Sequence, residues 1–579
     1  MSTRSKVLRG SALVACAALV LSACGGGGGG GGQGGGVFAD CAENPNTCNS
    51  ADPSELQDGG EIAYALEKNI PNWNLTSAEG NILETGLALR GVLPYTYVTL
   101  PDLTVAMNED LLVSAEQTSA DPQTIVYEIQ PDAVWSDGTP ISAQDFLYNW
   151  KVQNGRDCPD CAAASTSGYD QVDSVVGSDN GKTVTVTFAL PYTDWQNLWS
   201  SGAPLYPAHI AAQQGDLNTP QGLAAAFGYF GAAIPTYSGG PFQIEDFDNN
   251  VSLIEVPNPG WYGDGPNLDR LIFRIITDAA QEPTALANNE VQIIYPQPQV
   301  DLVQQVQNIP GVSSFVGLGL TWEHFDLNLN NPYLADEALR DAMFTAVNRQ
   351  EVIDATVGQF ADAVEPLNSH TLMPQQEGYT NVVSETGHGS GNLEAAQQIL
   401  TDAGYQMQGR QLMAPNGQAV PSLRIRYTTG NQIRQDQSEL FARQVAPLGI
   451  DVQVQPTDDL GGTLTQGDYD IMVFAFVSSP FPFANAQQAY STGGGNNFGG
   501  YSNPEVDRLL AAAASSTDLG QARRQLAQAD RILSEDAYVL PIYQKPTFIA
   551  AYDNIGNVRN NSSLDGPLYN VAQWGIRAG

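Results

Sequence analysis

The chain has 579 residues, of which 24 are Lys or Arg and 63 are Asp or Glu, so its formal net charge is −39 at pH 7. Nucleic acid and anionic bilayer surfaces repel a polyanion, and the charge therefore argues against both as direct partners. Apolar residues make up 42% of the chain. That is enough to build large cores, which we expect to divide among two or three compact regions.

The N-terminus reads as an export signal that ends in a lipidation site. Three basic residues precede an apolar run, residues 11–21, which is too short to span a bilayer as a mature helix. Residues 21–24 read Leu-Ser-Ala-Cys and match the bacterial lipobox, in which the Cys thiol receives acyl chains such as palmitate. We predict a signal peptide over residues 1–23 and a lipidated Cys24; the alternative is an ordinary cleaved signal.

Glycine dominates the residues after the lipobox, with eleven glycines and one glutamine over 25–36. A tract without side chains to bury behaves as a flexible tether of about 20 Å r.m.s. span. We therefore predict a tether over residues 24–57. It would hold the rest of the chain at the extracytoplasmic face of the cell membrane, with membrane contact through the N-terminal lipid only.

The remaining cysteines form two local pairs. Cys16 leaves with the signal peptide and Cys24 takes the lipid, which leaves Cys41, Cys48, Cys158 and Cys161. Because an exported chain meets an oxidising environment, we predict two disulfides, one in each pair. A four-thiolate zinc site, or a redox-active pair at 158–161, is the alternative.

The first part of the chain after the tether contains strand and helix signals. Alternating apolar residues over 124–129 predict a strand, and Ser142 followed by Asp145 predicts a capped helix. The runs 172–176 and 183–190 flank Ser-Asp-Asn-Gly-Lys, which predicts a hairpin. The same residues nearly match a phosphate-binding loop, but valines and threonines follow where a helix is needed.

The second half of the sequence reads as α/β. Apolar patterns predict strands over residues 423–427, 451–455 and 469–476. Amphipathic patterns with capping residues predict helices over 336–347, 393–403, 435–448, 504–514 and 519–533.

Three motifs in fixed order identify a family resemblance. Trp-Ser-Asp-Gly-Thr-Pro at 135–140 leads into the capped helix, and Gly-Gly-Pro-Phe-Gln-Ile at 239–244 precedes Pro-Asn-Pro-Gly-Trp-Tyr at 257–262. Phe-Asp-Leu-Asn at 325–328 is followed by Leu-Arg-Asp-Ala at 339–342. Together they resemble the extracytoplasmic solute-binding proteins of ABC importers, family 5, which includes oligopeptide, dipeptide and nickel binders. Within this family, the chain most resembles the actinobacterial members.

The resemblance implies an α/β, two-lobed periplasmic-binding-protein-like fold (type II, cluster C) with an extra subdomain inserted in the first lobe. By the family's layout, the first lobe takes three segments, the insertion one segment and the second lobe one segment. These are 58–90, 236–318 and 537–579 for lobe I, 91–235 for the inserted subdomain and 319–536 for lobe II.

The function implied by the resemblance is capture of a small solute between two lobes, followed by delivery to the membrane subunits of an ABC permease. We expect a monomer without a cofactor and without catalytic residues. An extracellular hydrolase is the rival class, but no zinc-protease motif or nucleophile elbow is present. A nickel site would need several histidines together, and only four exist; we therefore predict no metal.

One departure from the family pattern bears on the ligand. Peptide binders of this family often place an Asp shortly before a Pro to hold the peptide's ammonium group; aligned on Pro480, that position is Phe476. Its ring is either core or part of an aromatic wall for an amphiphilic or glycosidic solute. Some lipoproteins of this family in mycolic-acid bacteria are linked to mannosylated phosphatidylinositol, so a glycolipid-binding or envelope-regulating role is the alternative. The candidate ligand-binding residues are Tyr95, Trp322, Phe476, Phe481, Asn496 and Asn497.

Overall fold

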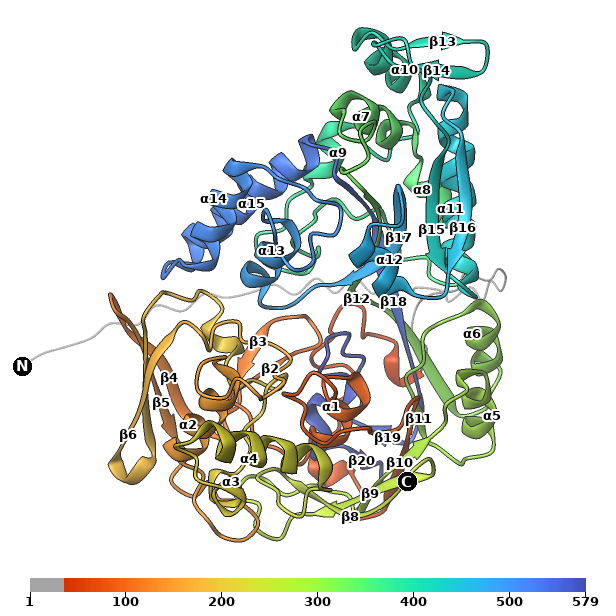
Figure 1. Cartoon of the computed structure of the whole chain (residues 1–579). Helices are drawn as coiled ribbons and strands as arrows, with labels where there is room; N and C mark the ends of the chain where they lie inside the picture. The colour runs from red at the N-terminus through yellow and green to blue at the C-terminus, as the bar shows by residue number, and fades with distance from the viewer. Residues whose placement is uncertain (1–35) are drawn as a thin grey trace, which may run out of the picture. The chain divides into compact units, whose positions relative to one another are not determined.

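The computed structural model describes residues 36–579 (Figure 1). The predicted signal peptide, the lipidated Cys24 and the first part of the tether lie outside the described residues. Over 36–579, every helix is too short or too polar to cross a bilayer.

A mixed ten-stranded sheet forms the framework, in the order β16-β15-β17-β12-β18-β11-β1-β10-β9-β8. Two long strands, β12 (Val312–Leu327) and β18 (Val539–Tyr552), pair antiparallel in its centre and belong to both halves. A register shift between Leu318 and Trp322 divides that pairing. We call the strands on one side of this shift the first half of the sheet and those on the other side the second half.

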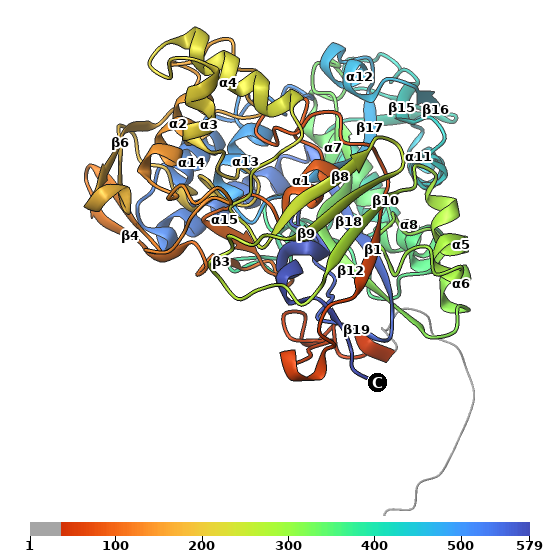
Figure 2. The same ribbon diagram turned by 90° about the horizontal axis from the view of Figure 1, so that it is seen from below.

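The first half of the sheet contains both parallel and antiparallel pairs of strands, and Figure 2 shows β1, β10, β9 and β8 side by side. Its strands are β1 (Glu61–Leu66), β8 (Phe242–Asp248), β9 (Ser252–Pro257), β10 (Arg270–Ile275) and β11 (Ile293–Ile294). Three helices accompany them, α1 (Leu83–Leu89), α5 (Glu282–Ala287) and α6 (Val300–Gln307).

The second half follows the α/β pattern expected from the sequence. Its strands are β15 (Leu423–Thr428), β16 (Val452–Thr457) and β17 (Ile471–Val477), and a small hairpin pairs β13 (Gln406–Gln408) with β14 (Gln411–Met413). The helices are α7 (Glu337–Ala346), α8 (Arg349–Ala355), α9 (Val382–Thr386), α10 (Leu393–Asp402), α11 (Gln432–Val445), α12 (Leu460–Gln466), α13 (Pro482–Tyr490), α14 (Pro504–Ala514) and α15 (Leu519–Glu535).

Side-chain alternation on β12 separates two hydrophobic cores. Phe325 packs on Phe441 of α11, with ring centroids 4.7 Å apart, in the core that covers one face of the sheet. Trp322 belongs instead to the core formed with α13, α14 and α15 on the other face. The two faces of the second half are therefore covered by different groups of helices.

Between β1 and β8 the chain forms an inserted subdomain. Its four-stranded antiparallel sheet has the order β4-β5-β7-β6, and Ser142 caps α2 with Asp145 completing the capping box, as predicted. The predicted hairpin is also present, because β6 pairs antiparallel with β7. The elements are β2 (Tyr97–Thr99), β3 (Val105–Met107), β4 (Leu112–Ala120), β5 (Gln123–Ile129), α2 (Ala143–Gln153), β6 (Val172–Ser178), β7 (Thr183–Phe188), α3 (Ala208–Gln214) and α4 (Pro220–Ala232).

The inserted subdomain shares its hydrophobic core with the first half of the sheet. A single cluster of buried side chains contains Trp135, Phe146 and Trp199 of the subdomain together with Tyr64 and Phe273 of β1 and β10. The helices of the second half lie in other clusters, one of which also contains Ala63 of β1, Ile294 of β11 and Val303 of α6. The subdomain is thus joined by its core to the first half.

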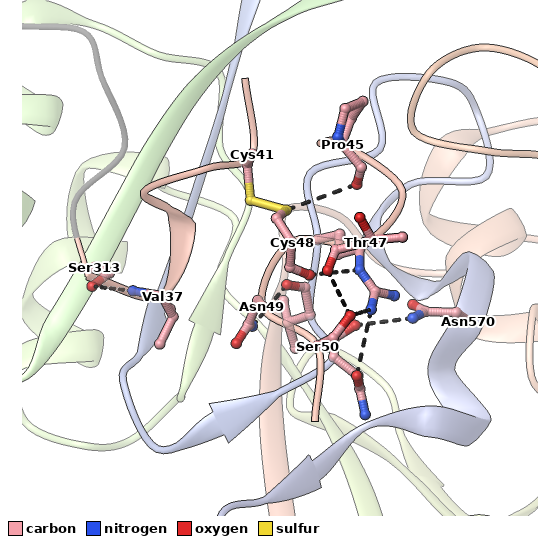
Figure 3. Close-up of a disulfide and its surroundings, with 12 residues drawn as sticks. Val37, Cys41, Pro45, Thr47, Cys48, Asn49, Ser50, Ser313 and Asn570 are labelled. Atoms are coloured by element: carbon pink, nitrogen blue, oxygen red, sulfur yellow. Dashed lines mark hydrogen bonds between the residues drawn. A yellow bond between two sulfur atoms is a disulfide. The ribbon is translucent and has the colours of Figure 1, made fainter. Parts of the chain in front are cut away.

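Residues 36–57 differ from the tether that the sequence predicted. Phe38 is fully buried, and the sulfur atoms of Cys41 and Cys48 are bonded (Figure 3). Asn49 donates hydrogen bonds to the carbonyl oxygens of Ile555 and Val558 at 3.1 and 2.9 Å. The glycine content suggested a tether as far as residue 57, but Phe38 and the disulfide provide buried groups that fix residues 36–57 to the C-terminal part of the chain.

The second pair of cysteines lies in the inserted subdomain. The sulfur atoms of Cys158 and Cys161 are bonded at 2.03 Å, just after α2. Both disulfides have the pairing expected from the sequence, and each closes a short loop.

Candidate functional site

The carboxyl end of β17 opens into a pocket that we call the aromatic pocket. β17 and β12 pair in register, so that Trp322 lies opposite Phe476 with ring centroids 5.8 Å apart. The chain then leaves the sheet, and Pro482 at the first position of α13 begins the next helix. The aromatic pocket has a volume of about 210 Å³, and its walls include Trp322, His370, Phe476, Asn485, Tyr490 and Asn496.

Two histidines adjoin this pocket, one stacked on Phe476 and the other held by two hydrogen bonds. His324 lies below it, stacked on Phe476 with 4.5 Å between ring centroids. Burial, with smaller effects from the charges of Arg434 and His370, holds the pKa of His324 well below its usual value. His370 is anchored by Nδ1 to Asp530 at 2.8 Å and by Nε2 to the Val539 carbonyl at 2.9 Å. The residues that line the aromatic pocket include no carboxylate.

A second cavity, which we call the shared cavity, lies between the inserted subdomain and the second half. It has a volume of about 450 Å³, within the range of small-molecule sites. Three aromatic rings line it, Trp195 from the subdomain, Phe481 from the segment before α13 and Phe483 from α13 itself. Five amide side chains are among its lining residues, namely Gln117, Gln123, Gln196, Gln375 and Gln376, and those of Gln123 and Gln376 are bonded within the protein at both ends.

The shared cavity carries few charges. Its lining includes Asp194, Glu377 and Arg523, and the last two form an ion pair at 2.7 Å. Burial raises the pKa of Asp194 to about 7, against the opposing effect of hydrogen bonds from the Ala484 and Phe483 amides. Amides, hydroxyls and aromatic faces therefore dominate the surface that this cavity offers.

A third groove, of about 690 Å³, lies beside the central strands on another side of the molecule. Its charged lining residues are Asp301, Glu323, Asp436 and Lys545; Lys545 lies 3.7 Å from the carboxylate of Glu323, which Arg434 contacts at 3.0 Å. None of the residues predicted from the sequence lines it. We therefore base the candidate site on the other two cavities.

The structure brings four of the six predicted ligand-binding residues to these cavities. Trp322, Phe476 and Asn496 line the aromatic pocket, and Phe481 lines the shared cavity. Both cavities border the segment 477–486, which leads from β17 into α13.

The other two predicted residues lie elsewhere. The Asn497 side-chain amide donates to the carbonyls of Ser491 and Tyr501 at 2.9 and 2.7 Å, so it holds its own loop together. The guanidinium carbon of Arg90 lies over the ring of Tyr95, 5.3 Å from the ring centroid. Burial raises the pKa of the Tyr95 hydroxyl to about 12. Neither residue lines the aromatic pocket or the shared cavity.

The lining residues that the sequence did not predict come from both lobes, and those of the inserted subdomain are the most distant in sequence. Asp194 and Trp195 lie almost 300 positions before Phe481, in a segment without a recognisable motif. Only the folded chain places them together. Among residues 36–579, no group of three or more His, Cys, Asp or Glu side chains is arranged to hold a metal ion.

A central pair of strands common to two half-sheets, with a cavity between the halves, defines the two-lobed class of binding proteins. The family model for bacterial extracellular solute-binding proteins, family 5 Middle, matches residues 107–498. The chain therefore belongs to family 5 of the bacterial extracellular solute-binding proteins. Its members are solute-binding proteins of ABC importers rather than enzymes, which agrees with the expected absence of catalysis.

Individual relatives refine this assignment. The oligopeptide-binding protein OppA of Mycobacterium tuberculosis is 30% identical over 515 residues, 88% of this chain and 84% of that protein. The structure of the periplasmic EDTA-binding protein EppA is 36% identical, with a TM-score of 0.86, covering 92% of this chain and 99% of that one. The probable monoacyl phosphatidylinositol tetramannoside-binding protein LpqW of M. tuberculosis is 27% identical over 350 residues, 58% of this chain and 51% of that protein.

These similarities confirm the predicted fold class. The chain has the two-lobed α/β binding-protein fold with an extra subdomain inserted in the first lobe. From here on, lobe I means the first half of the sheet with its helices and the inserted subdomain, and lobe II means the second half with its helices.

Proposed function

We propose that this protein is the lipid-anchored binding component of an ABC importer, and that it captures an uncharged or amphiphilic solute and delivers it to the permease. The single observation that carries this proposal is the shared cavity, which has Trp195 on a wall from lobe I and Phe481 on a wall from lobe II. A ligand in such a cavity contacts both lobes only when they are closed, so its binding energy drives closure.

The lining of the two cavities supports a ligand with little charge. A buried charge without a partner is costly, and the only cation that lines either cavity, Arg523, is paired with Glu377. A polycarboxylate such as the EDTA of EppA would need more cations than these walls supply. An oligopeptide-like solute, as in the name of OppA, suits the amides of the shared cavity, which can bond both to peptide N–H and to C=O groups.

The test of solute capture is the identification of material that copurifies with the protein. We expect denaturation of freshly purified protein to release a stoichiometric solute that mass spectrometry identifies as uncharged or amphiphilic. The variant Phe481→Ala, which truncates a wall of the shared cavity, should release less of it. A polyanion recovered in equal amounts from both proteins would contradict the proposal.

The proposed anchor is tested separately through Cys24. Without acyl chains only a solvated tether would remain, so Cys24→Ser should move the protein from the membrane fraction to the soluble fraction. The matched control is Cys16→Ser, which changes a cysteine that we expect to be removed with the signal peptide. A Cys24→Ser protein that stays in the membrane pellet after a salt wash would refute the anchor.

A second candidate function is the binding of a mannosylated phosphoinositide glycolipid. The observation in its favour is the similarity to LpqW, together with the aromatic faces of Trp322 and Phe476, because flat rings pack on sugar faces and on acyl chains. Organic-solvent extraction of the purified protein distinguishes the two candidates, since a glycolipid partitions into the solvent and an oligopeptide remains in water.

A further inference from the structure

We propose that two loops of the inserted subdomain form a latch that fastens lobe I to lobe II around the closed shared cavity. The latch consists of Thr193 and Asp194, in the loop after β7, and of Leu103, at the tip of the β2–β3 turn. This inference rests on the proposed capture of a solute between the lobes, but its test measures closure directly and needs no identified ligand.

Thr193 caps the end of α14 in lobe II. Its backbone N–H donates to the carbonyl of Ala514 at 3.0 Å. Its hydroxyl lies 2.7 Å from the Ala513 carbonyl and 2.8 Å from that of Ser516, so it donates to one or shares its hydrogen between both. The last carbonyls of a helix lack hydrogen-bond donors within the helix. Here Thr193, a residue of the other lobe, donates to them.

The carboxylate of Asp194 lies at the N-terminus of α13, a helix of lobe II. Its Oδ2 accepts a hydrogen bond from the Ala484 backbone N–H at 2.9 Å, and the residue is 4% exposed. Ala484 is the third residue of α13, where N–H groups have no intrahelical acceptor and a negative charge is favoured. Two adjacent residues of lobe I therefore place donors at one helix C-terminus and an acceptor at another helix N-terminus.

Leu103 provides the apolar part of the latch. It is 5% exposed and belongs to the hydrophobic cluster of α13, α14 and α15, although its own turn belongs to lobe I. Its φ of +67° lies in the left-handed region that bulky residues rarely adopt. Such backbone conformations persist where surrounding contacts hold them, and here the contacts are those of the opposite lobe.

The location of these residues makes them a latch rather than part of a permanent core. The inserted subdomain shares a large core with the first half of the sheet, whereas the helices that it touches belong to a separate cluster. Leu103, Thr193 and Asp194 all line the shared cavity. Separation of the lobes would therefore break the latch and open the cavity at the same time.

The test combines small-angle X-ray scattering with amide hydrogen exchange on full-length protein stripped of bound solute. We expect Asp194→Ala and Thr193→Val to increase the radius of gyration and to raise the exchange rate of the Ala484 amide at least tenfold in Asp194→Ala. The matched controls Asp194→Asn and Thr193→Ser keep an acceptor and a hydroxyl, and should behave like the parent protein. Leu103→Ala should also open the lobes without changing a hydrogen bond.

Two results would overturn the latch: unchanged scattering in all three disrupting variants, or equal effects of Asp194→Ala and Asp194→Asn. Failure of the proposed function gives a different signature, because a protein that captures no solute can still close through these contacts. Thermal unfolding of each variant, with a midpoint close to that of the parent, establishes that changes in scattering reflect lobe separation.

Discussion

The aromatic pocket and the shared cavity differ in where their walls come from. The aromatic pocket lies within lobe II, and its central pair, Trp322 and Phe476, is set by the register of two adjacent strands. The shared cavity takes Trp195 from one lobe and Phe481 from the other. The first is therefore formed within one lobe, whereas the second needs both lobes together, so the closure that we propose would act through the second.

The same difference explains what could be predicted from the sequence. Apolar periodicity and capping residues were sufficient for β15, β17, α11 and α15, because these signals are local. The alignment on Pro480 drew attention to Phe476 and Phe481, which both line cavities.

Residues whose role depends on distant partners could not be predicted. Asp194 belongs to no recognisable sequence motif. Its carboxylate accepts a hydrogen bond from the Ala484 N–H of α13, which only the folded chain brings close. Asn497 was expected to contact ligand from its place where the strand of the second lobe opens, but its amide is used by its own loop. The packing of residues 36–57 likewise depends on the C-terminal part of the chain, more than 490 positions away.

The largest expected effect is a difference in the free energy of unfolding between substitutions in the two sites. Trp322 is 1% exposed in the core of lobe II, so Trp322→Ala should lower the free energy of unfolding by about 3–5 kcal/mol. Trp195→Ala, in the shared cavity, should cost less because that ring is only partly buried. Urea titration of both variants checks this, and equal losses would mean that the two sites are equally part of the core.

A charge in the aromatic pocket should abolish ligand retention. Phe476→Asp places an unpaired carboxylate beside Trp322 and His324, and we expect at least a hundredfold loss of affinity, or about 3 kcal/mol. Phe476→Leu is the control that keeps an apolar side chain. Quantification of copurifying solute by mass spectrometry provides the measurement, and retention by the Asp variant would show that the ligand does not reach this pocket.

Buried carboxyl groups predict a stability that decreases as pH rises. Burial raises the pKa of Asp326 to about 8 and that of Asp194 to about 7, whereas an Asp in the unfolded chain ionises near about 4. Between these values the unfolded state releases protons that the folded state keeps. The stabilisation is therefore complete below about pH 4 and is lost by about pH 8.

Thermal unfolding at several pH values tests this prediction. Acidification from pH 8 to 5.5 should raise the free energy of unfolding by up to about 3 kcal/mol for Asp326. Asp326→Asn, which cannot ionise, should flatten the profile, while Asp468→Asn, at an exposed and paired site, should not. A variant profile parallel to that of the parent would exclude Asp326 as the source.

The smallest expected effect concerns Phe481. Its ring lines the shared cavity but is only partly buried, so Phe481→Ala should weaken solute binding about tenfold, or about 1.4 kcal/mol, with little change in stability. Calorimetric titration with the identified solute measures this. A change in stability without a change in affinity would assign the ring to packing.

Capture of a solute of low charge is tested by calorimetry with two peptide pools that are identical except for N-terminal acetylation. We expect Phe476 to replace the Asp that related peptide binders often have, and in the shared cavity Asp194 is engaged by the Ala484 amide while Glu377 is paired with Arg523. We predict that acetylated peptides bind at least as tightly as free-amine peptides. Micromolar binding that tightens when the amines are free would contradict it, because a carboxylate would then be anchoring the ammonium group.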